Sequence, residues 1–523
     1  MNFVGLYQSL DASQSTLAKR DALIQFIKTA DALESAFGIA LLLGYRLPQR
    51  LSHRMLRQTA SHIFTDTPWL FEDCYAAVGD LSETLAILLA DTERPAADKV
   101  PVLTDWVAQQ QRLTQMAPEQ VPNAVITTLQ DLSRDEAFLF LKLSTGGFRV
   151  GVSRGLVHDA IARVIGIDRA VIDERLMGGL TPERNWLELL SQPVSDAEAQ
   201  ARPLPFLLAN PWQPEDQEHM SPDSLVAEYK WDGIRCQLIK TDDLIRLWSR
   251  GDHDITTQFP DLVAAAQSLP SGLILDGEIL ILKEGHPESF ASLQVRLNRK
   301  RVTNALLASH PAVFRAYDCL RYGGDDLRDR PLHERRERLA SLPVEQSPQI
   351  EAETWEQLTQ AREAARQVGA EGLMLKRSDG PYLSGRKAGL WWKWKLDPMT
   401  ADCVLIYAQA GHGRRATLHT DFTLAAWQED QLVPVAKAYS GLSDAELKQI
   451  DRWVRDHTEA KFGPVRQVLP QLVFEIGFEG IARSTRHKSG IALRFPRILR
   501  WRQDIGIADA DHLSHFHQLL AIQ

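Results

Sequence analysis

A proline-rich passage near residue 200 separates two different hydrophobic patterns in this sequence. Before it, apolar side chains such as Leu23, Phe26 and Ile27 recur at helical spacing behind a capping residue at Ser15. After it, short alternating apolar runs are bounded by turn residues, which is typical of strands. Prolines interrupt regular elements, and the passage contains Pro193, Pro203, Pro205, Pro211 and Pro214. The chain therefore combines a helical part with strand-containing parts.

The length of 523 residues is too great for one ordinary core and favours three domains. We expect an all-α domain over 1–200, an α+β domain over 201–400 and a small β-barrel over 401–523. Short strands are expected at 225–229, 236–239, 244–248 and 273–275. A capping box of Thr354 with Gln357, and a stop at Gly369, predict a helix over 355–368. In the last part, strands are expected at 403–407 and 472–476, with one clear helix over 443–457.

Composition excludes several classes of protein. The chain is 44% hydrophobic and 24% charged, which is typical of a globular protein. The longest apolar run, 39–43, is far shorter than the roughly 18 residues of a membrane span, so we expect no membrane partner. The N-terminus lacks a basic segment leading into an apolar one. The four cysteines are scattered, which argues against a zinc ribbon or a disulfide framework and suits a reducing cytoplasm.

Local basic surface says more about a polyanionic partner than the formal net charge of -9. One stretch from 486 to 502 contains six cations and no acidic side chain. These cations are Arg486, Lys488, Arg494, Arg497, Arg500 and Arg502.

The segment 228–235, Glu-Tyr-Lys-Trp-Asp-Gly-Ile-Arg, is the most informative string in the chain. Lys230 directly follows a predicted strand, and the turn at Asp232 and Gly233 can hold it rigidly in a cleft that Arg235 also faces. Taken alone, this pattern could equally be an ordinary turn with exposed charges. Further motifs follow it in order: Ser249–Gly251, Leu275–Ile279, Phe314–Asp318, Glu371–Lys376 and Trp391–Lys395.

This series resembles the motifs of the covalent nucleotidyltransferases, which comprise DNA ligases, RNA ligases and mRNA-capping enzymes. Leu493–Arg502 is similar to the C-terminal signature of the ATP-dependent DNA ligases. A large helical region ahead of the motifs resembles bacterial ligases with an N-terminal DNA-binding domain. The resemblance implies an α+β nucleotidyltransferase domain of the ATP-grasp-like adenylation type, followed by an OB-fold. Scattered cysteines weigh against the NAD-dependent ligases, which carry a four-cysteine zinc module.

The chemistry of a lysine nucleophile agrees with this resemblance. An amine that attacks phosphorus must be neutral, yet only about one free lysine in a thousand is neutral near pH 7.5. Neighbouring cations favour the neutral form. Lys393 and Lys395 lie two residues apart on a predicted strand and would point the same way. The resemblance gives Lys230 the role of AMP-lysine nucleophile and places Lys393 and Lys395 on the α-phosphate.

The resemblance also implies the residues that bind ATP and a divalent cation, Mg²⁺ or Mn²⁺. Carboxylates suit such a cation, and the family places Glu278 near the ribose and the metal and Glu371 at the metal. A guanidinium matches phosphate oxygens. The ATP-binding set is Glu228, Lys230, Arg235, Arg250, Glu278, Phe314, which would stack on adenine, Arg386 and Lys393. A gapless match lands on Lys387, so Arg386 and Lys387 remain alternatives, with Arg386 favoured.

In the C-terminal signature, Arg500 and Arg502 would act on the charge of the leaving pyrophosphate. Relatives commonly continue this motif with Asp-Lys, whereas this chain has Asp504 and Ile505. We therefore hypothesise that AMP loading is slower or recruits another cation, such as Lys488.

The loop 143–153 is similar to a DNA-contacting loop of the ligase helical domain. Its adjacent glycines would let backbone amides approach phosphates, and Arg149 and Arg154 are the expected DNA contacts. The sequence thus predicts an ATP-dependent DNA ligase that seals nicks in double-stranded DNA during repair or replication. We expect a monomer that closes around the duplex in the bacterial cytoplasm. Two alternatives remain: an RNA ligase or capping enzyme, and a DNA-binding scaffold with a dead transferase site.

Overall fold

The structure is a computed structural model. It describes residues 1–13, 15–48, 51–78, 80–90, 102–146, 148, 150–192, 202–299, 301–410, 418–439, 441–462 and 465–522. The chain divides into two compact units. The first consists of Met1, Ala12–Tyr45 and Val152–Leu396, and the second of Asn2–Asp11, Arg46–Gly151 and Asp397–Gln523. The N-terminal helical region contributes to both units.

The N-terminal region is helical, as its apolar spacing predicts. Ser15 caps α2 by accepting a hydrogen bond from the Ala18 amide, and Leu23, Phe26 and Ile27 are buried. None of the helices in the described part of the chain has the length and apolar character of a membrane-spanning segment. The helices are α1 (Phe3–Ala12), α2 (Thr16–Thr29), α3 (Ala32–Leu42), α4 (His53–Ile63), α5 (Pro68–Val78), α6 (Leu81–Ala90), α7 (Leu103–Gln115), α8 (Val121–Gln130), α9 (Arg134–Thr145), α10 (Arg154–Ile165), α11 (Arg169–Arg175) and α12 (Trp186–Ser191).

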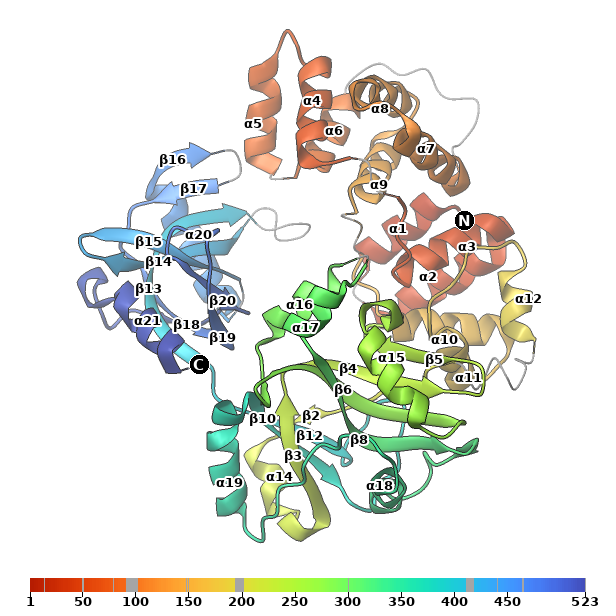
Figure 1. The fold of residues 1–523 in the computed structure, drawn as a ribbon. Helices are drawn as coiled ribbons and strands as arrows, with labels where there is room; N and C mark the ends of the chain where they lie inside the picture. Colours follow the sequence, from red (N-terminus) through yellow and green to blue (C-terminus); the bar gives the residue numbers. More distant parts are fainter. Residues whose placement is uncertain are drawn as a thin grey trace. The chain divides into compact units, whose positions relative to one another are not determined.

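The middle of the chain is α+β and contains two main sheets (Figure 1), which are antiparallel except for the parallel pair of β2 and β12. One has the order β5-β4-β6-β8-β9, with β7 paired to β6, and the other the order β2-β12-β10-β3. A short parallel pair joins β1 to β11. The strands are β1 (Leu207–Leu208), β2 (Asn210–Pro211), β3 (Leu225–Trp231), β4 (Ile234–Lys240), β5 (Ile245–Ser249), β6 (Leu273–Lys283), β7 (His286–Pro287), β8 (Ala312–Tyr322), β9 (Asp325–Asp326), β10 (Ala370–Arg377), β11 (Gly385–Arg386) and β12 (Trp391–Lys395).

Helices of the middle region cover the outer faces of these sheets. Leu358 of α19 packs with Leu225 and Leu373 behind the sheet that contains β3 and β10. The predicted capping box of Thr354 and Gln357 is confirmed, and the helical segment ends at Gly369 in the left-handed region. The helices are α14 (Pro214–Glu218), α15 (Pro260–Ala265), α16 (Phe290–Leu297), α17 (Asn304–Ser309), α18 (Leu332–Ala340) and α19 (Trp355–Ala364), which a 3-10 turn over Ala365–Val368 extends.

The C-terminal part is rich in strands and has the OB-like architecture that the resemblance implies. Its main sheet has the order β15-β14-β13-β17-β16, with β18 bridging β13 and β21, and β19 pairs with β20. The strands are β13 (Met399–Ala410), β14 (His419–Gln428), β15 (Gln431–Ala438), β16 (Thr458–Phe462), β17 (Val465–Val468), β18 (Val473–Phe478), β19 (Gly480–Arg483), β20 (Ile491–Arg494) and β21 (Arg497–Arg502). The predicted multidomain class, all-α, then α+β nucleotidyltransferase, then OB-like, is therefore confirmed.

The expectation of one clear helix in this part was wrong. The predicted helix is α20 (Asp444–Asp456), capped by Ser443, but α21 (Leu513–Ile522) follows near the C-terminus. Leu513 and Phe516 of α21 pack into the core of the barrel. The second helix is stabilised by this tertiary packing, which leaves little local signal in the sequence.

Candidate functional site

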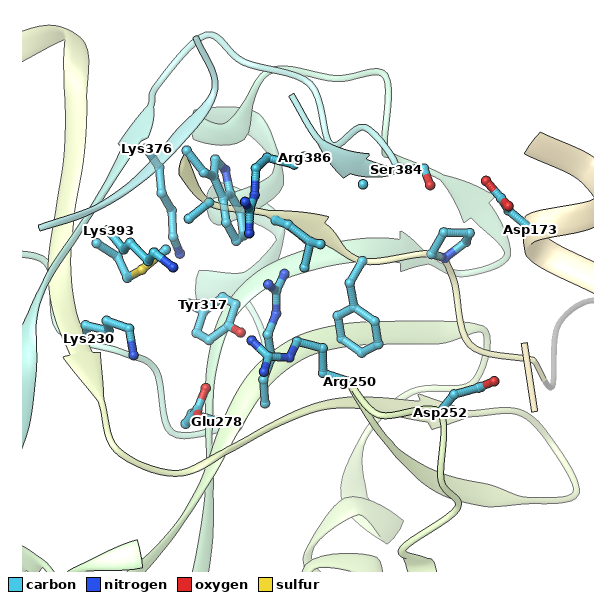
Figure 2. Close-up of a pocket in the computed structure, with 18 of the residues that line it drawn as sticks. Asp173, Lys230, Arg250, Asp252, Glu278, Tyr317, Lys376, Ser384, Arg386 and Lys393 are labelled. Carbon is cyan, nitrogen blue, oxygen red and sulfur yellow. The ribbon is translucent and has the colours of Figure 1, made fainter. Parts of the chain in front are cut away.

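A cavity of ≈ 690 Å³ lies in the first unit and gathers most of the expected site residues. Figure 2 shows Lys230, Lys393, Glu278, Arg250 and Arg386 around it. These side chains come from strands, or from the turns directly after them, in both main sheets and in the short β1–β11 pair, which contains Arg386. Sheet geometry therefore brings together residues that are more than 150 positions apart in the sequence.

Lys230 lies near the end of β3, directly before the turn that leads into β4. Gly233 in this turn packs so closely on β6 that an added Cβ would collide with the Ile279 carbonyl and the Glu278 side chain. The side chain of Lys230 is 23% exposed, and its Nζ donates to Glu371 Oε2 at 2.5 Å. The predicted turn thus holds Lys230 in a cleft, and a carboxylate fixes its amine.

Glu371 owes its position to an irregularity in β10. The register of β10 against β3 shifts between Ala370 and Leu373, and Gly372 has a φ of 136°. A Cβ on Gly372 would collide with the Trp394 carbonyl of the neighbouring strand, so only glycine fits there. Besides Lys230, Lys395 lies near the same oxygen, with its Nζ 3.5 Å from Glu371 Oε2.

Lys393 and Lys395 lie two residues apart on β12, and Lys393 lines the cavity. Burial lowers the pKa of Lys393, and the nearby cations Lys395, Arg386, Lys230 and Arg250 lower it further. Aromatic packing covers the opposite face of the strand, where Trp392 is buried beside Trp212. This arrangement concentrates positive charge, which suits a bound polyphosphate.

Glu278 of β6 lines the cavity near Lys230. Burial raises the pKa of Glu278 to about 8, although the charges of Lys230 and Arg235 act in the opposite direction. The charged form of such a buried carboxylate would be stabilised by a bound cation or by a hydrogen bond from a hydroxyl group.

Arg235 lies at the cavity wall, but its charge is already balanced by a residue that the sequence reasoning missed. Its Nη2 and Nε donate to the fully buried Asp276 at 2.7 and 3.2 Å. Its guanidinium also lies 5.0 Å from the Phe206 ring and 5.2 Å from the Trp391 ring. The signal for Asp276 was present in the motif Leu-Asp-Gly-Glu, where only the glutamate was interpreted.

Arg250 and Arg386 both line the cavity, whereas Lys387 is not among the lining residues. The Lys387 carbonyl accepts a hydrogen bond from Asn210. Within the described ranges, neither Arg250 nor Arg386 forms an ion pair with a protein carboxylate. These two guanidinium groups are therefore available to an anion, and the geometry favours Arg386 over Lys387.

The stacking role expected for Phe314 is not supported by its position. Phe314 is 4% exposed and packs in the core cluster behind β6, against Gly277. Three residues further along β8, Tyr317 lines the cavity instead. Side chains alternate between the faces of a strand, so residues three apart face opposite sides. Because Phe314 faces the core, Tyr317 is the aromatic residue of this motif that faces the cavity.

Tyr317 lines the cavity close to a buried ion-pair cluster. Glu228 accepts a hydrogen bond from Lys376 Nζ at 2.8 Å and pairs with Arg336. Lys376 Nζ lies 4.1 Å from the centre of the Tyr317 ring and 4.5 Å from that of Trp391. The sequence reasoning missed Lys376, although a lysine within an apolar strand is a recognisable signal because its burial requires a partner.

The helical region also reaches the cavity. Arg154, at the start of α10, lines it and donates from Nη2 to Asp252 at 2.7 Å. Arg149, the other expected DNA contact, lies outside the described residues.

Arg500 and Arg502 lie on β21 in the second unit, where carboxylates of the same part hold both. Arg500 pairs with Glu475, and Arg502 donates to Asp402 at 2.5 Å and to Asp504 at 2.8 Å. Ile505, which replaces the usual lysine, packs against the small apolar cluster of Val404, Val473 and Ala510.

Comparisons with known proteins agree across the chain. Three family profiles match: "DNA ligase N terminus" over 1–162, "ATP dependent DNA ligase domain" over 207–395 and "ATP dependent DNA ligase C terminal region" over 415–505. A probable DNA ligase of Koribacter versatilis is 34% identical over 85% of this chain and 83% of its own length. A DNA ligase of Natronomonas pharaonis is 33% identical over 73% of this chain and 71% of its own.

A solved structure described as "Pmar-Lig_Pre." shares the fold, with a TM-score of 0.60, 15% identity, and coverage of 96% of this chain and 99% of that one. All three profiles describe DNA ligases, which favours that interpretation over the RNA-ligase and capping alternatives. Such enzymes seal nicks in DNA with ATP through an adenylate intermediate. The chain belongs to the family of ATP-dependent DNA ligases.

Proposed function

We propose that Lys230 is the residue that becomes adenylylated. Its Nζ attacks the α-phosphorus of ATP, forming a nitrogen–phosphorus bond as the bond to pyrophosphate breaks. The AMP then passes to the 5′-phosphate at a nick, and the 3′-hydroxyl finally displaces AMP to join the strand. The observation that carries this proposal is the position of Lys230 Nζ in a cavity that also presents Lys393, Arg250 and Arg386.

The expected cations would each have a distinct role. Lys393 and Lys395, on β12 of the sheet that also contains Lys230, would offset charge on the reacting phosphoryl group. Arg250 and Arg386 have no protein counter-ion within the described ranges and would clamp phosphate oxygens. Arg500 and Arg502 would act on the leaving pyrophosphate, after exchanging their present carboxylate partners for it.

The residues around Tyr317 would hold the base. Tyr317 would stack on adenine in place of Phe314, and Glu228 would face the edge of the base through its neighbouring backbone. Arg235, fixed by Asp276, would contact the ribose or phosphate from the wall. Glu278 would lie beside the ribose.

Glu278 and Glu371 suit a divalent cation, Mg²⁺ or Mn²⁺. Both carboxylates lie near Lys230, where phosphates would arrive. Among the described residues no group of three or more His, Cys, Asp or Glu side chains could hold a metal. Two carboxylates completed by phosphate oxygens and water are the environment that Mg²⁺ prefers. When bound, such a cation would neutralise phosphate charge during the displacement.

The proposed substrate is nicked double-stranded DNA, bound mainly through its backbone and therefore with a strong dependence on salt. Arg154 and Arg149 would take part in this contact. We propose domains over 1–200, 201–400 and 401–523, in a monomer that closes around the duplex. This DNA would be that of the bacterial cytoplasm and nucleoid.

A substrate panel with the full chain tests this function. Nicked DNA, a nicked RNA–DNA hybrid and nicked RNA would each be offered with ATP and Mg²⁺, and GTP would be tested in parallel. We expect sealing of nicked DNA with ATP, its loss on chelation of the metal, and little activity in the other arms. Equal or better joining of RNA, or labelling by GTP alone, would contradict the proposal.

A further inference from the structure

Asp252 connects the helical region to the nucleotide cavity through both of its carboxylate oxygens. Its side chain is 4% exposed. Oδ2 accepts from Arg154 Nη2 at 2.7 Å, at the start of α10, and Oδ1 accepts from the Gly178 amide, in the turn after α11. Two separate points of the helical region are thus fixed to one carboxylate of the nucleotidyltransferase domain.

The turn that carries Asp252 is tight and specific. The Asp252 amide donates to the Ser249 carbonyl at 2.9 Å, and the Ser249 amide donates to the His253 carbonyl at 2.9 Å. Asp252 has a φ of 63°, a left-handed conformation that is uncommon for a residue other than glycine. Such a conformation persists only where the surroundings hold it. The contacts with Arg154 and Gly178 provide that support.

Arg250, two residues earlier in the same turn, is a cavity cation. In Figure 2 the side chains of Arg250 and Asp252 point in opposite directions, and both residues line the cavity. The Arg250 amide donates to the Arg235 carbonyl at 3.0 Å, which ties the start of the turn to β4. The far end of the turn is tied to β5 by the bond from the Ser249 amide to the His253 carbonyl. Between these two ends, Asp252 attaches the turn to the helical region, and we infer that this attachment influences the direction of the Arg250 side chain.

We propose that Asp252 is a positioning residue for AMP loading, and that it acts by holding the Arg250 turn against Arg154 and Gly178 of the helical region. This inference rests on the proposed function of Arg250 as a phosphate clamp. It gives the helical region a part in the chemistry that precedes DNA binding. A residue that only contacts DNA would have no influence on that step.

AMP loading in the absence of DNA is the decisive measurement. Single-turnover transfer of labelled AMP from ATP, with Mg²⁺, would be followed in the full chain with Asp252→Asn, with Arg154→Gln and with both changes. Loss of a charge-assisted hydrogen bond from this partly exposed pair should slow the reaction about tenfold. Because both single changes break the same contact, the double variant should be no slower than the slower single variant. Arg154→Lys, which keeps the charge, should restore part of the rate.

Two matched variants separate this effect from general damage. Arg163→Gln removes an arginine of the same helix that pairs with Asp159 and is 53% exposed. Asp254→Asn changes a neighbouring carboxylate that pairs with Arg246 instead. Both should load AMP at the wild-type rate, which also shows independently that the proposed function holds.

Two results would overturn the inference while the wild type still loads AMP. In the first, Arg154→Gln and Asp252→Asn load at the wild-type rate without DNA. In the second, the double variant loads AMP more slowly than either single variant, by the product of the two single reductions in rate. Thermal unfolding of each variant would show whether it is correctly folded. Arg154→Gln is the safer test because the Arg154 side chain is 40% exposed. A lower maximal loading rate at an unchanged half-saturating concentration of ATP would support the inference, because it places the effect on the reacting phosphate.

Discussion

Glu371 Oε2 accepts a hydrogen bond from Lys230 Nζ at 2.5 Å, across 141 positions of sequence. The contact depends on the irregular start of β10, where Gly372 allows the chain to turn Glu371 toward the cleft. Lys395 lies near the same oxygen. One glycine thus determines where the carboxylate of the adenylylation site can lie.

Gly372→Ala should therefore damage stability and activity together. A Cβ would collide with the Trp394 carbonyl, and the φ of 136° is unfavourable for alanine. We expect a loss of about 2 kcal/mol or more in the free energy of unfolding, and AMP loading at least about tenfold slower. Denaturant unfolding and labelled AMP transfer would measure the two effects. Gly389→Ala is the matched control because it shares a positive φ of 77° but has open space around the Cβ, so wild-type loading is expected there.

Glu278 should make stability depend on pH. Its pKa rises from 4.5 to about 8 in the folded protein, so between these values the folded chain holds a proton that the unfolded chain has released. The contribution of Glu278 to the free energy of unfolding is greatest below pH 4.5, and it is lost as pH rises through about 8. The free energy of unfolding should fall by at most roughly 1.4 kcal/mol per pH unit from this group.

Glu278→Gln removes this titration. Relative to the wild type, the variant should therefore become progressively more stable from pH 5 to pH 8, in denaturant unfolding without nucleotide or metal. Glu363→Gln, an exposed change on α19, should run parallel to the wild type. A difference between Glu278→Gln and the wild type that stays constant with pH would contradict the prediction.

Ile505→Lys tests the departure from the family motif. Ile505 packs against Val404 and Val473 in the C-terminal part, so a lysine there would lose apolar contacts. Its aliphatic chain could still carry the ammonium group to solvent. We expect a loss of about 1 kcal/mol in the free energy of unfolding and no gain in the rate of AMP loading. Faster loading would show instead that the missing cation limits this step, as the sequence alone suggested.

Local signals in the sequence predicted much of the fold. The capping box at Thr354 and Gln357 and the glycine stop at Gly369 depend on neighbouring residues, and both were predicted correctly. The alternation of Lys393 and Lys395 on one strand is equally local. The α21 helix was missed because it is stabilised mainly by distant packing of Leu513 and Phe516.

The candidate site was less predictable where it depends on contacts between distant residues. The Asp276 partner of Arg235 is 41 positions away, and the Asp252 partner of Arg154 is 98 positions away. No spacing rule connects such residues before the sheets form. Phe314 was assigned by its place in a motif, whereas the alternation along β8 presents Tyr317 to the cavity. The two aromatic residues are three positions apart and therefore face opposite sides of the strand.

Mapping the adenylylated residue tests the central claim most directly. The full chain would be incubated with labelled ATP and Mg²⁺, digested, and sequenced by mass spectrometry, with Lys230→Ala as the control. We predict one adenylyl group on Lys230, and in Lys230→Ala no adduct and no sealing of nicked DNA, although the variant still binds that DNA. An adduct on another residue, or undiminished sealing by Lys230→Ala, would contradict the account.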